Sequence, residues 1–261
     1  MASSTISSAT HGLSPCSPLN DPEKTPGHWL LARMGKRVLR PGGRELTRRM
    51  LEQLDIQPRD AVVEFAPGLG VTARMTLSRN PASYTAIERD EAAAAQVRSY
   101  LTGPNQRCHL GNAERTGLDD QSATVVYGEA MLTMQGAEQK RKIVAEAFRL
   151  LKPGGRYGIH ELGFTPDDLP RDIQEDISRE MSRNIHVGAR PLALREWREL
   201  LTGAGFQIQA EAVVPMHLLE PRRLIRDEGW LSALRFVFNV LRRPQARKRV
   251  LEELQVDAAW A

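Results

Sequence analysis

Cysteines and long apolar runs are both scarce in this chain of 261 residues. Its two cysteines, Cys16 and Cys108, lie far apart, and Cys16 falls in a Ser/Pro-rich stretch. Neither a disulfide framework nor a metal site such as zinc is therefore expected. No run approaches the roughly 18 apolar residues of a membrane-spanning helix. The start of the chain also lacks a basic segment followed by an apolar one, so we expect no secretory signal and a cytoplasmic location.

Dense blocks of basic residues are missing too, although the formal net charge is +4. The arginines are spread along the whole sequence, whereas a nucleic-acid-binding arm concentrates them. The Asn/Asp-Pro-Pro-Tyr type of motif that acts on bases flipped out of DNA is absent as well. We therefore expect no nucleic-acid partner. The apolar content of 41% and the charged content of 26% are ordinary for a globular protein.

Composition and apolar periodicity divide the chain into four parts. These are a disordered Ser/Thr/Pro-rich tail, an N-terminal helical cap, a central domain with an inserted helical cap, and a C-terminal helical segment. The expected boundaries are residues 1–26, 27–58, 59–218 (with the insertion at 163–190) and 219–261. Outside the central domain and its insertion, helices are expected at 28–39 and 44–54, with two more between 220 and 255.

From residue 60 onward, short apolar strands alternate with helices. This pattern predicts an α/β fold, a doubly wound and mostly parallel sheet covered by helices on both faces. The expected strands are 61–65, 83–88, 107–110, 123–128, 155–161 and 206–214. The expected helices are 71–79, 90–101, 137–151 and 194–203, with a helix of residues 167–184 in the insertion.

The first strand runs into a glycine turn that opens a helix. Glu64 stands where the strand ends, and Gly68 and Gly70 follow. Open α/β sheets bind ligands at this edge, where glycine allows close approach and positive φ. Glu88, at the end of the second strand, is placed to accept hydrogen bonds from ribose hydroxyls. Residues 68–73 also satisfy the G-x-G-x-x-A dinucleotide pattern, so NAD stays open at this point.

Later segments in the same order favour a different nucleotide. Small polar residues follow the third strand at 111–114, and a Lys-Pro-Gly-Gly turn at 152–155 precedes the fifth strand. The fourth strand ends near 129–131, and a helix with Trp197 leads to an Ala-Gly-Phe turn at 204–206. This ordered set resembles the class I S-adenosylmethionine-dependent methyltransferases, particularly the small-molecule branch with the ubiquinone and sterol biosynthesis enzymes. The resemblance covers roughly residues 60 to 215.

The resemblance implies a Rossmann-like methyltransferase fold with S-adenosylmethionine laid across the strand ends. The family's first glycine position holds Ala66 here. The implied contacts are Glu64, Ala66, Gly68 and Gly70 at the methionine part, Glu88 at the ribose, Asn112 and Ala113 at the adenine, and Glu129, Ala130 and Met131 beneath the sulfonium. The 152–155 turn lies at the opposite end of the sheet, so we assign it a structural role.

Methyl transfer from a sulfonium is an in-line displacement with an activated leaving group. The protein has mainly to align the acceptor and exclude water. A general base is needed only where the acceptor loses a proton. His160 and Glu161, at the end of the fifth strand, are the candidate bases, although His160 could equally be a structural histidine.

The acceptor is expected to be a small, partly apolar organic molecule, because the flanking helices indicate a lidded apolar pocket. Arginines at 222, 223, 226, 235, 242 and 243 leave a peripheral membrane contact open. The family's antiparallel seventh strand has no apolar counterpart near residue 261, so it is either missing or formed by splitting residues 212–219. Two other functions stay open, an NAD-dependent oxidoreductase and a catalytically silent cofactor-binding or scaffold protein.

Overall fold

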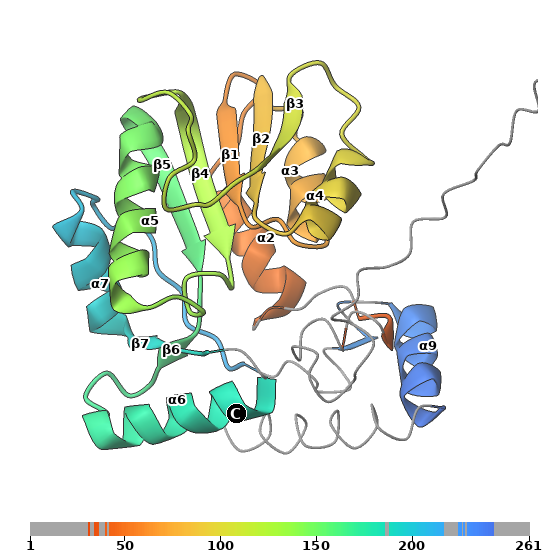
Figure 1. Ribbon diagram of the computed structural model, residues 1–261, viewed down its shortest axis with the longest axis vertical. Helices are drawn as coiled ribbons and strands as arrows, with labels where there is room; N and C mark the ends of the chain where they lie inside the picture. Colours follow the sequence, from red (N-terminus) through yellow and green to blue (C-terminus); the bar gives the residue numbers. More distant parts are fainter. Residues whose placement is uncertain are drawn as a thin grey trace, which may run out of the picture.

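A computed structural model describes residues 31, 34–36, 40, 42–185, 188–216, 224–225, 227 and 229–242. Its centre is a five-stranded parallel sheet in the order β3-β2-β1-β4-β5 (Figure 1). The strands are β1 (Ala61–Phe65), β2 (Ser83–Glu88), β3 (Gln106–Leu110), β4 (Ala123–Glu129) and β5 (Leu151–His160). The strand order reverses at β1 and β4, which is where doubly wound sheets bind their ligands. The predicted doubly wound α/β fold is confirmed.

Helices cover both faces of this sheet (Figure 1). The helices are α2 (Gly43–Gln53), α3 (Val71–Leu77), α4 (Glu91–Arg98), α5 (Ala137–Leu150), α6 (Arg171–Ile185), α7 (Leu194–Gly203) and α9 (Trp230–Leu241). A two-stranded parallel sheet, β6 (Gly163–Phe164) with β7 (Leu192–Ala193), brackets α6. The polar segment after the fifth strand is therefore a helix held between two short strands. The prediction for residues 28–39 falls largely outside the described residues.

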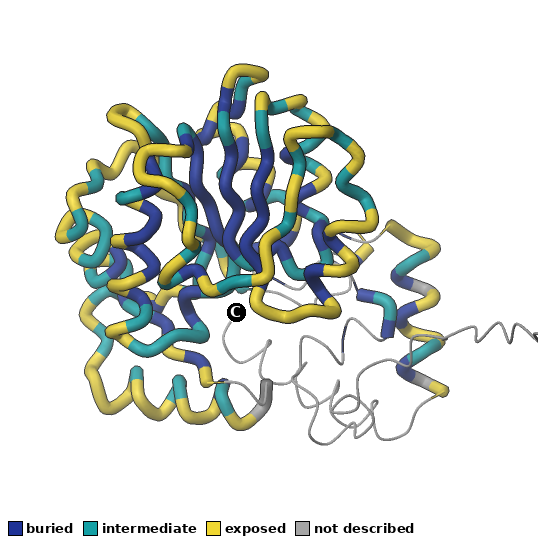
Figure 2. The backbone as a smooth tube through the Cα atoms, turned by 45° about the horizontal axis from the view of Figure 1, so that its top comes forward, coloured by how far each residue is buried: buried dark blue, intermediate teal, exposed yellow. Residues whose placement is uncertain are grey.

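Alternation along the strands builds two apolar cores, one on each face. Val126 of β4 belongs to the core beneath α5 and α7, whereas Val125 and Tyr127 belong to the core beneath α2, α3 and α4. The three central strands, β1, β2 and β4, are buried along most of their length (Figure 2). Since side chains alternate, Glu64 and Glu129 point toward the same face as Tyr127. The sheet thus places two acidic residues in the layer that holds the N-terminal helix α2.

Residues 206–214 do not form the predicted strand. Residues 206–216 carry no regular secondary structure and pair with no strand of the sheet, and β5 is the edge strand. The alternating sequence is compatible with a strand, but a strand also needs a hydrogen-bonded neighbour. Here a cavity lined by both segments lies between β5 and residues 205–216. β5 is also longer than predicted, because residues 151–154 belong to it.

The segment before α9 connects the C-terminal part of the chain to α2. Asp227 is 4% exposed, and its Oδ1 accepts the backbone N–H of Arg44 at 3.0 Å in the first turn of α2. A carboxylate at this position satisfies a free helix amide and interacts favourably with the helix dipole. The Asn239 side chain of α9 also donates to the Met34 carbonyl at 2.9 Å. Described residues before and within α2 therefore contact described residues before and within α9.

Candidate active site

The glycine turn after β1 is held against the end of β2. Glu88 is 5% exposed, and its Oε2 accepts the Gly68 N–H at 3.1 Å. Its Oε1 accepts the N–H groups of Arg89 at 2.9 Å and Asp90 at 3.1 Å. Three backbone amides therefore fix this carboxylate. The structure brings together the two features that the sequence singled out first.

The turn itself needs residues that tolerate positive φ. Gly68 and Gly70 have φ values of 53° and 71°, and Ala66 has a φ of 51° despite its Cβ. A Cβ added at Gly68 would meet no atom within 4 Å, whereas one at Gly70 would collide with the Tyr100 hydroxyl. Gly70 is thus required by packing. Gly68 leaves open space in front of the turn, beside Glu88.

Glu64 lies behind the turn, in the core beneath α3. Its Oε2 accepts hydrogen bonds from the Tyr84 hydroxyl at 2.5 Å and the Tyr127 hydroxyl at 2.6 Å. Burial raises the pKa of Glu64 to about 7, against the lowering effect of the two tyrosine hydroxyls. Near neutral pH this carboxyl is therefore divided between its protonated and ionised forms.

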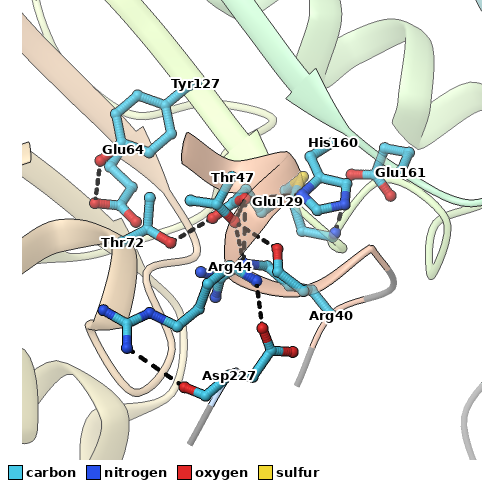
Figure 3. A network of polar contacts seen from close by, with 12 residues as sticks. Arg40, Arg44, Thr47, Glu64, Thr72, Tyr127, Glu129, His160, Glu161 and Asp227 are labelled. Carbon is cyan, nitrogen blue, oxygen red and sulfur yellow. Dashed lines mark hydrogen bonds and ion pairs between the residues drawn. The ribbon is translucent and has the colours of Figure 1, made fainter. Parts of the chain in front are cut away.

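Glu129, at the end of β4, is the centre of a larger polar network (Figure 3). Its Oε1 accepts from Thr47 of α2 at 2.6 Å and lies 3.2 Å from Arg40 Nε. Its Oε2 accepts a short hydrogen bond from the hydroxyl of Thr72, in the first turn of α3. Burial by itself would raise the pKa of Glu129, but Arg40 and the hydrogen bonds of His160 and Thr47 lower it to about 2. The carboxylate is therefore ionised and anchors three elements.

His160 completes the network from β5. The register of β4 and β5 pairs it with Glu129, and its Nδ1 lies 2.8 Å from Glu129 Oε1 (Figure 3). An ionised carboxylate accepts only, so Nδ1 carries a proton, and in the neutral form of this tautomer the lone pair lies on Nε2. The side chain is 1% exposed, and Nε2 is buried without a hydrogen-bond partner. Buried polar atoms of this kind are rare in proteins and need an explanation.

The other candidate base, Glu161, has a different environment. Its Oε1 accepts the N–H groups of Met131 at 3.0 Å and Leu132 at 2.8 Å. Its Oε2 accepts two hydrogen bonds from Thr133, one from the backbone N–H at 2.9 Å and one from the side-chain hydroxyl at 2.7 Å. Burial raises the pKa of Glu161, and these hydrogen bonds lower it. The carboxylate thus holds residues 131–133 of the loop after β4. Ala130, just before them, has a φ of 51°.

The residues expected near an adenine ring lie after β3. Asn112 is exposed, and its Oδ1 accepts the N–H of Glu114 at 3.0 Å, which fixes the turn. Ala113 is 7% exposed and belongs to the core beneath α5. The Gly111 N–H donates to the Glu88 carbonyl at 2.9 Å. This turn therefore lies next to the residue expected at the ribose.

A large cavity opens along the free edge of β5. Its volume is about 1830 Å³, and its lining includes His160 and Glu161 but neither Glu88 nor the 68–70 turn. Apolar side chains from α2, α6 and α7 contribute to its wall, among them Leu46, Met50, Ile177, Met181 and Trp197. The cavity is larger than the roughly 300–1,000 Å³ of most ligand pockets, because it continues along the unpaired strand edge.

Sequence reasoning missed Arg40, Thr47 and Thr72. Thr72 follows the glycine turn closely, so its place in the first helical turn was a usable signal. The sequence around Arg40 and Thr47 gave no such signal, because only the packing of the N-terminal segment brings these residues to Glu129. Arg40 is 8% exposed, and its second terminal nitrogen, Nη2, is buried without a partner.

Solved structures of low sequence identity share this fold. Cyclopropane synthase MmaA2 of Mycobacterium tuberculosis has a TM-score of 0.62 at 16% identity, over 82% of this chain and 77% of that one. Geranyl diphosphate C-methyltransferase of Streptomyces coelicolor has a TM-score of 0.56 at 16% identity, over 74% and 71%. Phosphoethanolamine N-methyltransferase 2 of Haemonchus contortus has a TM-score of 0.61 at 18% identity, over 88% and 55%.

Sequence comparison decides the family. Residues 62–155 match the family model described as a methyltransferase domain. An uncharacterized protein of Haemophilus influenzae is 31% identical over 220 residues, which are 83% of this chain and 86% of that protein. The chain belongs to the class I S-adenosylmethionine-dependent methyltransferases. Membership makes S-adenosylmethionine the cofactor and answers the question that the dinucleotide pattern left open.

The residues of this methyltransferase fit the cofactor. The open space at Gly68 lies beside a carboxylate fixed by backbone amides, which suits a ribose. The Nη2 group of Arg40 has no hydrogen-bond partner and can donate to a carboxylate, which is the group at the methionine end of the cofactor. A buried donor without a partner costs free energy unless a ligand supplies the acceptor.

Proposed function

We propose that this methyltransferase transfers a methyl group to a small, partly apolar organic acceptor, with His160 as the general base. The observation that carries the proposal is the buried Nε2 of His160, which has no partner while Glu129 holds Nδ1. This arrangement selects the tautomer that a neutral ring adopts, with its lone pair on Nε2 directed away from the carboxylate. The bound cofactor supplies an electrophilic methyl group on its sulfonium.

In the proposed mechanism each residue has a separate task. Glu88 orients the ribose, and Arg40 binds the methionine carboxylate through Nη2. His160 accepts a proton from the acceptor as its nucleophilic atom attacks, and the ionised Glu129 stabilises the imidazolium that forms. Glu161 fixes the loop after β4 and does not take the acceptor's proton, because four hydrogen bonds already occupy its oxygens.

The acceptor class rests on the cavity beside β5. Its wall is largely made of apolar side chains, and His160 lies at one part of it. Such a wall favours a partly apolar molecule that carries one ionisable group. Two of the similar structures hold small acceptors of their own, geranyl diphosphate and phosphomonomethylethanolamine. The atom that receives the methyl group is oxygen, carbon or nitrogen.

Replacing His160 tests the base. Tritium transfer from methyl-labelled S-adenosylmethionine into organic products of a metabolite extract would be measured for His160→Ala and for the control His109→Ala, an exposed histidine of β3. We expect a loss of about 10²-fold or more for His160→Ala and no change for the control. S-adenosylhomocysteine affinity, measured by calorimetry, should stay unchanged in both. Equal transfer by His160→Ala and the parent chain would refute the base assignment.

The same assay separates catalysis from silent binding. Tight S-adenosylhomocysteine binding without transfer to any extract or purified acceptor would favour a cofactor-binding scaffold instead. Transfer that depends on His160 would exclude that reading. Glu161→Gln should lower thermal stability, yet leave transfer per folded molecule within a few-fold of the parent.

Replacing Arg40 tests the cofactor's methionine end. Arg40→Gln should weaken binding of S-adenosylhomocysteine by about tenfold or more, because a charge-assisted hydrogen bond is lost. Binding of 5′-methylthioadenosine, which lacks the amino-acid part, should change little. Arg48→Gln is the matched control, since Arg48 is an exposed α2 residue paired with Glu52. An equal loss for both ligands would mean that Arg40 only supports the fold.

A further inference from the structure

Helix α9 packs onto the protein through one face. Ala233, Phe236 and Val240 are 5%, 5% and 8% exposed, and their spacing places them on one side of the helix. Asn239 adds the hydrogen bond to the Met34 carbonyl. These contacts account for one side of α9 and leave the other directed toward solvent (Figure 2).

The outer face of α9 is apolar as well. We define it by four residues that are large and well exposed: Trp230 at 63%, Leu231 at 65%, Val237 at 46% and Phe238 at 52%. Just before the helix, Ile225 is 52% exposed. A surface helix ordinarily carries polar residues on its outer face, and a helix that is apolar all round is normally covered. The outer face of α9 therefore requires a partner.

The charges at this face are all of one sign. Residues 230–242 contain Arg235 and Arg242, both exposed, and no acidic residue. The Arg242 guanidinium lies 4.3 Å from the centre of the Phe238 ring. Arginine side chains can lie along apolar surface in this way while their charge reaches outward. An apolar face bordered by arginines, with tryptophan and phenylalanine in it, matches an anionic lipid surface.

We propose that α9 lies in the surface of an anionic membrane, with its outer face at the boundary between headgroups and acyl chains. A second copy of the chain fits less well, because pairing two such faces would bring Arg235 and Arg242 close to arginines of the same kind. None of the helices within the described residues is long and apolar enough to cross a bilayer, so α9 would bind along the surface. The inference does not depend on the methyl-transfer proposal.

Vesicle sedimentation of the full chain tests the inference. We expect sedimentation with vesicles of phosphatidylcholine mixed with phosphatidylglycerol, and much less with phosphatidylcholine alone. Phe238→Glu should weaken binding at least about tenfold, because it places a charge in the apolar boundary and repels the anionic lipid. Arg235→Gln and Arg242→Gln should each weaken it about fivefold, and added salt should do the same.

Matched variants show whether an effect is local. Leu110→Glu adds the same charge at a 53% exposed residue of β3, and Arg48→Gln removes an exposed arginine of α2, so both should bind vesicles like the parent chain. Unchanged S-adenosylhomocysteine affinity of Phe238→Glu would show that this variant is folded. Failure of the parent chain to bind mixed vesicles, or equal binding by Phe238→Glu, would overturn the proposal. So would a lipid-free dimer that Phe238→Glu dissociates, since the outer face would then belong to a second copy.

Discussion

The titration of Glu64 should be visible in the stability of the whole protein. Its carboxyl is 3% exposed and held by the hydroxyls of Tyr84 and Tyr127. Burial raises its pKa from an ordinary 4.5 to about 7, while the two hydroxyls act in the opposite direction. The nearby Glu129 carboxylate raises the pKa further, and Arg40 opposes it. The free-energy cost of ionising Glu64 in the folded protein should therefore appear as a dependence of the protein's stability on pH.

The direction of the change in stability with pH follows from the pH at which the folded and unfolded states each release the proton of Glu64. The folded protein keeps it until about pH 7, whereas the unfolded chain releases it near pH 4.5. Between these values the folded state binds more protons, so the free energy of unfolding decreases as pH rises. The separation of the two pKa values corresponds to a total decrease of about 3 kcal/mol. Well above pH 7, where both states have released the proton, the contribution of Glu64 no longer changes.

Urea unfolding followed by circular dichroism would measure this decrease between pH 4.5 and pH 7. Glu64→Gln keeps the acceptor oxygen and removes the titration, so its stability should exceed that of the parent increasingly as pH rises. Glu161, whose pKa burial also raises, adds a slope of the same sign to both proteins. The difference between the two curves is therefore the relevant quantity.

Glu146→Gln is the control for this experiment. The pKa of Glu146 is lowered to about 2, so this residue is ionised across the whole window. Its replacement should lower stability by an amount that becomes independent of pH about one unit above 4.5, where the unfolded chain is fully ionised. If Glu64→Gln kept the parent's slope, the reasoning from burial would be refuted.

Three further substitutions probe backbone and packing through thermal unfolding. Ala66→Gly should raise stability by up to about 1 kcal/mol, since positive φ is strained in alanine; a lower melting temperature would contradict this. Gly70→Ala should cost about 1–3 kcal/mol through its collision with the Tyr100 hydroxyl, and Tyr100→Phe should restore part of that loss. Asp227→Ala should cost about 1 kcal/mol by uncapping α2, and an unchanged melting temperature would show that water replaces the carboxylate.

For two strands, β1 and β2, the predicted bounds agree with the observed ones, and the reason is the same for both. Each is a short apolar run bounded by turn residues and fully paired in the sheet, so the local pattern and the tertiary surroundings agree. Residues 206–214 show the opposite case. Their alternation favours a strand, but the structure offers no hydrogen-bonded neighbour there. Strand formation depends on a partner that the local sequence does not encode.

In the candidate site, too, some features were predictable from the sequence and others were not. Glu88 and the glycine turn were recognisable because a parallel sheet brings the carboxyl ends of neighbouring strands together, and their spacing follows from strand length. The environments of the acidic residues were not recognisable. Glu64 and Glu129 both end central strands, yet the pKa of Glu64 is raised to about 7 and that of Glu129 is lowered to about 2.

The sequence by itself determined the order of the first five strands and of the helices between them, the glycine turn and the family resemblance. These features depend on local periodicity, on residues that permit positive φ, and on short-range spacing. The tertiary structure alone decided that Arg40 and Thr47 reach Glu129, and that Glu129 in turn holds one nitrogen of His160. It also decided which face of α9 remains exposed. Charge and burial act through space, so residues far apart in the chain set them together.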